Sequence, residues 1–192
     1  MTRLLLTLCA LGGVVTAAAA QDQACPFRAG MALATRPSPL DSVSFQVAGH
    51  VVKVCYGRPS LKGRTMIGGE AVPYGKVWRT GANETTKLIA TAPLSVGGIE
   101  IPAGMYALYT VPGETEWDVI VNRSYQQWGH ESTYSDSVKA QEVGRAKVKV
   151  ETLAAPIEQF TIRPEPQPDG SAQLVLEWQT TRVRVLVAPG KM

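Results

Sequence analysis

Apolar and polar residues alternate with period two over much of the chain, which is the pattern of half-buried β-strands. The alternation begins at Val43, is clearest from His50 to Tyr56 and returns between Ala146 and Val150. Helical periodicity is nearly absent after the first twenty residues, and Ser132 to Val143 can form at most a short turn of helix. Many short strands with closely spaced turn signals predict an all-β fold, either an antiparallel β-sandwich or a flattened barrel.

Turn signals divide the middle of the chain into short segments. Gly97-Gly98 is typical of a two-residue hairpin turn, and Pro112-Gly113 separates two strands that we expect to pair antiparallel. Residues 164–170 are rich in proline and predict a loop. The expected strands in this part of the chain cover residues 87–91, 94–96, 99–101, 105–111, 117–121, 146–150 and 158–162.

The last apolar residues predict a hairpin that turns at Gln179-Thr180. Pairing Glu177 with Arg182 places Leu176 opposite Val183. In this register the apolar faces coincide and opposite charges meet across the two strands, as cross-strand energetics favour.

The longest polar interruption runs from Tyr56 to Thr86, between two strand-like segments. It holds six glycines, three arginines and two lysines. Connections of this length in a compact domain are usually either functional or disordered, and the aromatic and β-branched content here argues against disorder. We therefore expect the site of binding or chemistry in this stretch.

The first twenty residues have the three parts of a secretory signal peptide. Arg3 supplies the positive region, Leu4 to Val15 the apolar region, and Ala18-Ala19-Ala20 a small-residue cleavage pattern. The apolar run is shorter than the roughly 20 residues that a membrane-spanning helix needs. The pattern predicts export to the periplasm or the extracellular space.

Three parts follow one another along the chain: a signal peptide (1–20), an irregular arm (21–40) and a single β domain (41–192). The formal net charge of +3 becomes +2 without Arg3. A charge this small gives no reason to expect nucleic acid or an anionic membrane as a partner. No segment after the signal peptide is apolar enough to span a bilayer.

Export places Cys25 and Cys55 in an oxidising compartment, where disulfides form. A disulfide between them would close a loop of about 30 residues and, by a chain-entropy argument, stabilise the fold by roughly 3–4 kcal/mol. The alternative is two unpaired thiols, with Cys55 packed as a small hydrophobe. We expect the disulfide, which would tie the arm to the strand that enters the glycine-rich stretch.

Motifs of familiar active sites are missing. The chain has no GxSxG elbow, no HExxH, no Walker loop and no GxGxxG after a strand. It has only two histidines, and no cysteine pair has zinc spacing, so we expect neither a metal site nor a cofactor. His50 is interpreted as a turn residue, and His130 can act as a lone general base, although no nucleophile or orienting acid accompanies it.

Basic side chains gather in the glycine-rich stretch. The cationic groups of Arg58, Lys62, Arg64 and Arg79 can converge on an anionic ligand, because guanidinium groups match the geometry of carboxylate and phosphate. The alternative is that the arginines pair with Glu70 or Glu84 of the loop itself, with no ligand involved.

Aromatic and amide groups add to this set. Trp78, Tyr74 and Tyr56 offer flat faces on which a sugar or another ring can stack. Asn83 and Glu84 supply an amide and a carboxylate at adjacent positions, although Asn83 can equally cap a turn. A second aromatic cluster, Trp128-Gly129 with Tyr134 and Asp136, either packs over the first or belongs to a satellite core.

Three functions fit these residues. The first is a non-catalytic binding module whose cleft takes a small polar, anionic or glycan-like molecule. The second is a hydrolase or lyase in which Glu84 is the general acid or base, Arg79 stabilises charge, and Glu70, Asp136 or Glu114 is the second carboxylate. The third is a purely structural envelope domain whose loop groups satisfy one another.

Three segments, YGRPSLKGR, VPYGKVWRTGANETT and IPAGMYALYTVPGETEWDVIVN with a following WG, carry a resemblance to a known family. Over roughly Pro37 to Val187 the chain resembles the exported bacterial family catalogued as domain of unknown function 2911. The resemblance implies a signal-bearing, β-rich single domain and carries no activity. Glu70-Ala71 departs from the family pattern, so Glu70 is left out of the candidate site.

The residues that coincide with the family pattern include most of the basic and polar groups of the glycine-rich stretch. Thr86 also coincides with the pattern and is therefore added to the candidate site. The candidate ligand-binding residues are Arg58, Lys62, Arg64, Trp78, Arg79, Asn83, Glu84 and Thr86.

Overall fold

The computed structural model describes residues 24–27, 35–129 and 131–191. The expected signal peptide and His130 lie outside the described residues. The strands are β1 (Leu40–Val47), β2 (His50–Gly57), β3 (Thr86–Ala90), β4 (Leu94–Val96), β5 (Ile99–Ile101), β6 (Gly104–Val111), β7 (Glu116–Asn122), β8 (Glu142–Pro166) and β9 (Ala172–Pro189). A 3-10 turn (Glu131–Thr133) and the short helix α1 (Asp136–Lys139) lie between β7 and β8.

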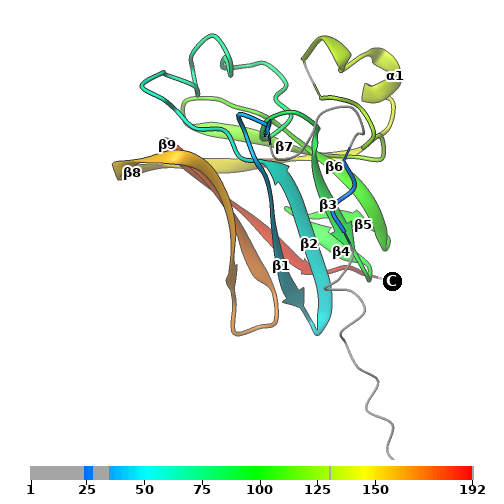
Figure 1. Ribbon diagram of the computed structural model, residues 1–192. Coiled ribbons are helices and arrows are strands. Elements are labelled where there is room, and N and C mark those ends of the chain that lie inside the picture. Colours follow the sequence, from blue (N-terminus) through cyan, green and yellow to red (C-terminus); the bar gives the residue numbers. More distant parts are fainter. Residues whose placement is uncertain (1–23, 28–34, 130, 192) are drawn as a thin grey trace, which may run out of the picture.

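Nine strands form one open antiparallel sheet in the order β1-β2-β3-β6-β7-β8-β9-β4-β5 (Figure 1). Two long strands fold this sheet over on itself. The first part of β8 pairs with β7 and the remainder pairs with β9, whose last residues pair with β4. The inner faces of the two halves meet in one core, so the expected antiparallel, sandwich-like all-β fold is confirmed.

The core explains the period-two pattern of the sequence. Val52 and Val54 of β2, Leu88 of β3 and Val119 of β7 project from one half, and Ile162 of β8 projects from the other. All five side chains are almost completely buried. Burying an aliphatic side chain of this size contributes roughly 1.5–3 kcal/mol, which is why every strand keeps one apolar face.

Five of the predicted short strands are present as β3 to β7, whereas residues 146–150 and 158–162 are parts of the single long strand β8, which also includes residues 164–166 of the predicted loop. Gly97 and Gly98 join β4 to β5 with φ values of 59° and 89°, the positive angles that a tight two-residue hairpin turn requires. The strands on either side of Pro112-Gly113 pair antiparallel as β6 and β7. The short helical segment predicted within 132–143 is present as α1.

The predicted final hairpin is wrong. Residues 172–189 form the single strand β9, in which Glu177 lies opposite Thr161 and Leu176 lies opposite Ile162 of β8. The strand kinks at Gln179, whose φ is 52°. This kink shifts the alternation by one residue, so the apolar residues that face the core have even numbers before it and odd numbers after it. A two-residue turn would produce the same change, which explains the error.

The kink also produces the predicted contact between Glu177 and Arg182, although within one strand. That contact belongs to a closed ring in which three arginines and three glutamates alternate. Each carboxylate of the ring contacts two guanidinium groups, and each guanidinium contacts two carboxylates. The order around the ring is Arg163, Glu177, Arg182, Glu151, Arg184, Glu165 and back to Arg163.

The ring makes the stability of the fold depend on pH. The hydrogen bond from Arg163 holds the pKa of Glu177 below its ordinary value, and hydrogen bonds from Arg163 and Arg184 do the same for Glu165. Because these pKa values are lower in the folded than in the unfolded chain, the stabilisation is present above the unfolded-state pKa of about 4.3. It is lost as the pH falls through the folded-state values.

We expect the denaturant midpoint of unfolding to be steady above about pH 5 and to fall below about pH 4.3. Glu177→Gln should flatten that fall, because one of the groups that titrate on unfolding has been removed. The matched control is Glu114→Gln, since Glu114 is exposed and makes no ion pair within the described part of the chain. An acid-induced fall that is as steep in Glu177→Gln as in the control would show that the ring is not responsible.

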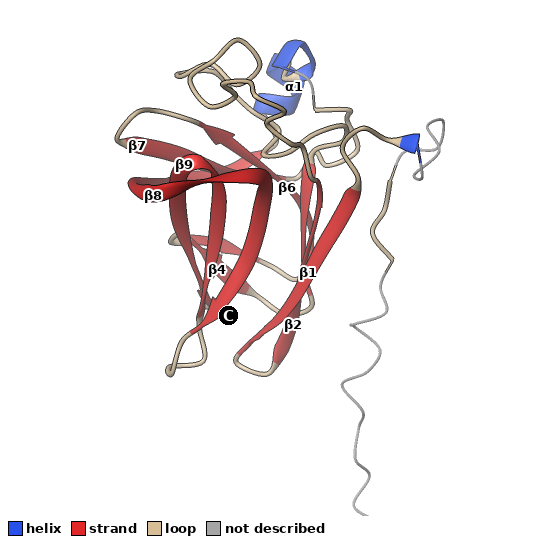
Figure 2. Cartoon of the chain, turned by 60° about the vertical axis from the view of Figure 1, so that its left-hand side comes forward, coloured by secondary structure: helices blue, strands red, loops and turns tan. Residues whose placement is uncertain are grey.

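The two ends of the folded sheet differ. At one end the β1–β2 turn is joined to the β8–β9 turn by a hydrogen bond from Ala48 N to Gly170 O (2.9 Å). At the other end lie the connection of residues 58–85 and the α1 segment, as both views show (Figures 1 and 2). The expected disulfide is present: Cys25 is bonded to Cys55, which fastens the N-terminal arm to β2.

Candidate functional site

The 58–85 connection is fixed to the opposite half of the sheet at two places. Near its start, Leu61 N donates to Glu158 O (2.9 Å), and Phe160 N donates back to Pro59 O (2.9 Å). Further on, the side-chain oxygen of Gln179 accepts hydrogen bonds from Met66 N (2.5 Å) and Ile67 N (2.6 Å). The side chain of Gln179, at the kink in β9, therefore holds the middle of the connection in place. The glycine-rich stretch is ordered, as predicted.

Two of the three basic side chains of the first half, those of Arg58 and Arg64, bind protein groups. Arg58 pairs with Asp41 of β1 (3.3 Å) and donates to Thr161 Oγ1 of β8 (3.1 Å). Arg64 donates to the backbone oxygens of Leu61 (3.0 Å) and Ser60 (3.1 Å). Arg58 thus binds the sheet, and Arg64 binds the connection itself.

Lys62 has its backbone, rather than its side chain, fixed to the sheet. Its backbone N–H donates to Glu158 Oε1 (2.9 Å), and its side chain is exposed. Its φ is 48°, in the left-handed region, which a residue other than glycine rarely adopts.

Trp78 lies in the core. It stacks on Trp178 with ring centroids 5.9 Å apart and meets Trp117 and Phe160 edge to face. Its indole Nε1 donates to Gly81 O (3.0 Å). The indole of Trp78 is therefore packed among aromatic side chains, and the ring of Tyr56 is buried as well, in edge contact with Phe160. Of the three aromatic residues considered for stacking, only Tyr74 is exposed.

Asn83 and Glu84 hold the N-terminal arm. Glu84 accepts two hydrogen bonds from Arg36, at 2.7 and 2.8 Å, in a buried bidentate ion pair. Asn83 Nδ2 donates to Ser38 O (2.9 Å). Sequence reasoning did not find Arg36, because it lies 48 residues before its partner in a segment without periodicity. A buried carboxylate needs a cationic partner, and this requirement was the only indication in the sequence that Glu84 has one.

Thr86 closes the stretch. Its hydroxyl donates to Thr80 O (2.6 Å), and its side chain is fully buried. The hydrogen bond shapes the turn that carries Arg79 and Asn83.

Arg79 is the predicted site residue with hydrogen-bonding capacity to spare. Its Nη1 donates to Asn83 O (2.6 Å) and to Trp128 O (3.3 Å). Both bonds use the same nitrogen, so the other N–H groups of the guanidinium bind no residue that the structure describes. No carboxylate of the described chain forms an ion pair with it, and burial lowers the pKa of this half-buried guanidinium.

The structure divides the second predicted cluster between its two alternatives, and the Trp128-Gly129 part lies against Arg79. Trp128 supplies one of the two carbonyl oxygens, and Gly129 packs directly against the side chains of Arg79 and Thr85. A Cβ atom on Gly129 would lie 2.7 Å from Thr85 Cγ2 and 2.9 Å from Arg79 Cβ. Its φ of 80° also favours glycine. Tyr134 instead packs on Tyr109 in a satellite core.

Arg79 lines a cavity of about 210 Å³, which we call the Arg79 cavity. Lys76 and Glu70 contribute the other charged groups, and Gly129 contributes backbone. The remaining lining is mostly apolar: Ala71, Val72, Pro73, Val77 and Trp78. Lys76 and Glu70 were not among the predicted site residues, and Glu70 had been set aside only because it departs from the family pattern.

A second cavity of about 390 Å³ adjoins the first, since Glu70 and Ala71 line both. Arg64, Thr65 and Met66 complete it. Arg64 is thus the one basic residue of the first half that lines a cavity near Arg79, whereas Arg58 and Lys62 lie against β1 and β8.

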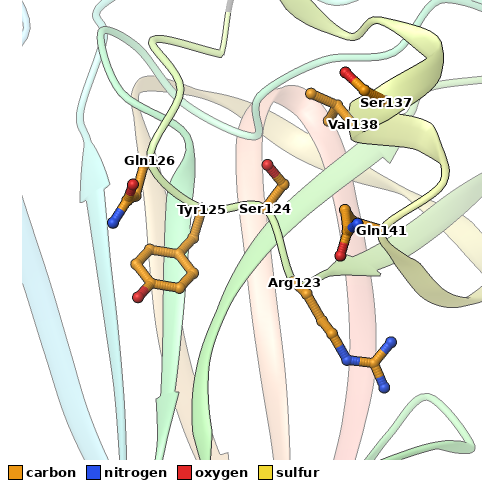
Figure 3. Close-up of a pocket in the computed structure, with 7 residues that line it drawn as sticks. All are labelled: Arg123, Ser124, Tyr125, Gln126, Ser137, Val138 and Gln141. Atoms are coloured by element: carbon orange, nitrogen blue, oxygen red, sulfur yellow. The ribbon is translucent and has the colours of Figure 1, made fainter.

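The largest described cavity, of about 420 Å³, lies beside α1 (Figure 3). Its lining comes from the segment after β7, where Arg123 and Tyr125 lie, and from the α1 segment, where Ser137, Val138 and Gln141 lie. Arg123 is exposed, and the other lining groups are neutral. The Arg79 cavity has the more distinctive chemistry, because it holds a half-buried cation without a carboxylate partner.

Within residues 24–27, 35–129 and 131–191, no three His, Cys, Asp or Glu side chains are grouped so that they could hold a metal ion. None of the helices in this part of the chain is long and apolar enough to cross a membrane.

Comparison with known proteins adds a family. Residues 38–187 match the model of the family described as "Protein of unknown function (DUF2911)". No curated protein and no solved structure matches the chain.

Proposed function

The chain belongs to the DUF2911 family, whose description assigns no function, and we propose from the geometry of the site that it is an exported binding module for a small anionic molecule. The ligand occupies the Arg79 cavity, and Arg79 binds its negative charge. The observation that carries the proposal is the half-buried guanidinium of Arg79, which has no carboxylate partner among the described residues and lines a cavity. Export is supported by the Cys25–Cys55 disulfide, since such bonds persist in oxidising compartments.

The electrostatics around Arg79 favour a negatively charged group on the ligand. Removing a cation from water is costly unless an opposite charge compensates it, and burial lowers the pKa of Arg79, an effect that the charge of Glu84 offsets only in part. An anionic ligand would complete that compensation, and the planar N–H groups of Arg79 that bind no described residue suit a carboxylate or a phosphate. Lys76 adds a second positive group to the same wall.

The site is also rigid before any ligand arrives. Asn83 O and Trp128 O fix the position of Nη1, and Gly129 packs on the side chain from the other side. A side chain held in this way loses little conformational entropy on binding. The other predicted residues, Asn83 and Thr86 in particular, contribute by shaping the turn around Arg79.

The hydrolase hypothesis has less support. A general acid or base must reach the proton that it transfers. Both carboxylate oxygens of Glu84 accept hydrogen bonds from Arg36, and the residue is buried. No observation favours catalysis at this carboxylate.

The test is binding of small carboxylates and inorganic phosphate, measured by calorimetry on the purified protein and on Arg79→Ala. We expect the wild type to bind and Arg79→Ala to bind at least roughly thirtyfold more weakly, because a desolvated ion pair contributes about 2 kcal/mol or more. Lys62→Ala is the matched control, since it removes an exposed positive charge from the same connection outside the described cavities. Arg79→Lys keeps the charge if alanine prevents folding.

Equal affinities of wild type and Arg79→Ala would contradict the proposal. So would an equal loss in the Lys62→Ala control, because the effect would then come from general charge and not from the Arg79 cavity.

A further inference from the structure

We propose that the ligand of the Arg79 cavity is a zwitterion, an amino acid or dipeptide whose carboxylate binds Arg79 and whose ammonium binds Glu70. This inference rests on the proposed function and adds the chemical class of the ligand. The observation behind it is that one small cavity is lined by both Glu70 and Arg79, and that no ion pair joins these two residues.

Glu70 has no hydrogen bond or ion pair with any residue that the structure describes. It nevertheless lines the same cavity as Arg79 and Lys76, and with Ala71 it separates this cavity from the adjoining one. Because Glu70 and Arg79 line one cavity without pairing with each other, they are complementary to a ligand that carries both charges. A ligand with only negative groups would meet the carboxylate of Glu70 and be repelled by it.

The backbone holds Glu70 at the tip of an ordered turn. Gly68 N donates to Val72 O (2.9 Å), and Gly69 N donates to Met66 O (3.1 Å). The ring of Tyr74 covers Gly68 so closely that a Cβ atom there would lie 2.7 Å from it. Gln179 also binds the backbone of this turn at Met66 and Ile67, so the backbone that carries the exposed Glu70 is held in place.

The size of the cavity limits the ligand. Its volume of about 210 Å³ is below the roughly 300–1,000 Å³ of sites for drug-sized molecules. The apolar lining that includes Val72, Pro73 and Val77 suits a short aliphatic body between two charged ends. The adjoining cavity of about 390 Å³, with Arg64 in its wall, can accept a side chain or a second residue.

The experiment compares four probes by calorimetry: L-alanine, glycylglycine, acetate and ethylamine. We expect at least one zwitterion to bind the wild type at least tenfold more tightly than acetate does, and ethylamine to bind most weakly. The stronger of the two zwitterions then identifies the spacing of the charges, as a free amino acid or as a dipeptide.

Two variants assign the charges. Glu70→Gln should bind the preferred zwitterion at least tenfold more weakly and leave acetate binding unchanged or stronger, whereas Arg79→Ala should lose both. Glu114→Gln, an exposed carboxylate outside the described cavities, is the matched control and should bind as the wild type does.

Acetate binding that equals zwitterion binding, in the wild type and in Glu70→Gln alike, would overturn the zwitterion inference and leave the anion-binding function intact. Absence of binding by all carboxylates, zwitterions and inorganic phosphate would overturn both.

Discussion

Replacing Arg36 with alanine lowers the free energy of unfolding by about 3–5 kcal/mol, the cost typical of breaking a buried ion pair from one side. The side chain of Arg36 is fully buried and that of Glu84 nearly so, and two hydrogen bonds of 2.7 and 2.8 Å join them. The variant leaves the carboxylate of Glu84 buried without its bidentate partner. Denaturant unfolding at pH 7, followed by tryptophan fluorescence, measures the change.

The double variant Arg36→Met with Glu84→Leu separates the ion pair from the packing around it. Replacing both charges with apolar groups of similar size is often neutral or stabilising, so we expect the double variant to recover most of the loss. Lys147→Ala is the surface control, because its ion pairs with Glu116 and Asp118 are exposed. A loss below about 1 kcal/mol in Arg36→Ala would mean that this pair does not fasten the arm.

Trp78→Ala lowers the free energy of unfolding by about 3–5 kcal/mol, because it opens a large cavity in the aromatic centre of the core. The indole contacts Trp117, Trp178 and Phe160, with ring centroids 5.0 to 6.1 Å apart. It also loses the hydrogen bond from Nε1 to Gly81 O (3.0 Å). Thermal and denaturant unfolding measure the effect.

Two comparisons sharpen this result. Trp78→Phe retains an aromatic ring and should cost less than alanine does, and Tyr74→Ala removes an exposed ring of the same connection with a small effect on unfolding. If Trp78→Ala left stability unchanged and reduced ligand affinity alone, the indole would be a stacking platform for a ligand and not a core residue.

Much of the fold could be predicted because the alternation of apolar and polar residues reports directly which face of a strand is buried. Gly97-Gly98 was recognisable for a similar local reason, since only the glycine pair adopts both positive φ angles without strain. The alternation does not indicate which other strand a given strand pairs with. A change of parity near Gln179 fits a hairpin and a kinked single strand equally well, and only the pairing with β8 decides between them.

The candidate site was predicted less completely, because its polar groups find partners far away in the sequence. Arg36 for Glu84 and Trp128 for Arg79 are examples. Residue type and crowding indicated that the stretch is special. They could not distinguish a guanidinium committed to the scaffold, as in Arg58, from one left facing a cavity, as in Arg79.

The sequence by itself determined the class of fold, the disulfide partners, the long ordered connection and the family to which the chain belongs. These follow from local properties: period-two alternation, two remaining cysteines, and the density of glycine and aromatic residues within one segment. Tertiary structure alone decided that Trp78 belongs to the core, that Glu84 holds Arg36, and that Arg79 and Glu70 line one cavity. The physical reason is that burial and pairing depend on which distant segments the folded sheet brings together. The pattern of residues along the chain does not contain the spatial distances between those segments.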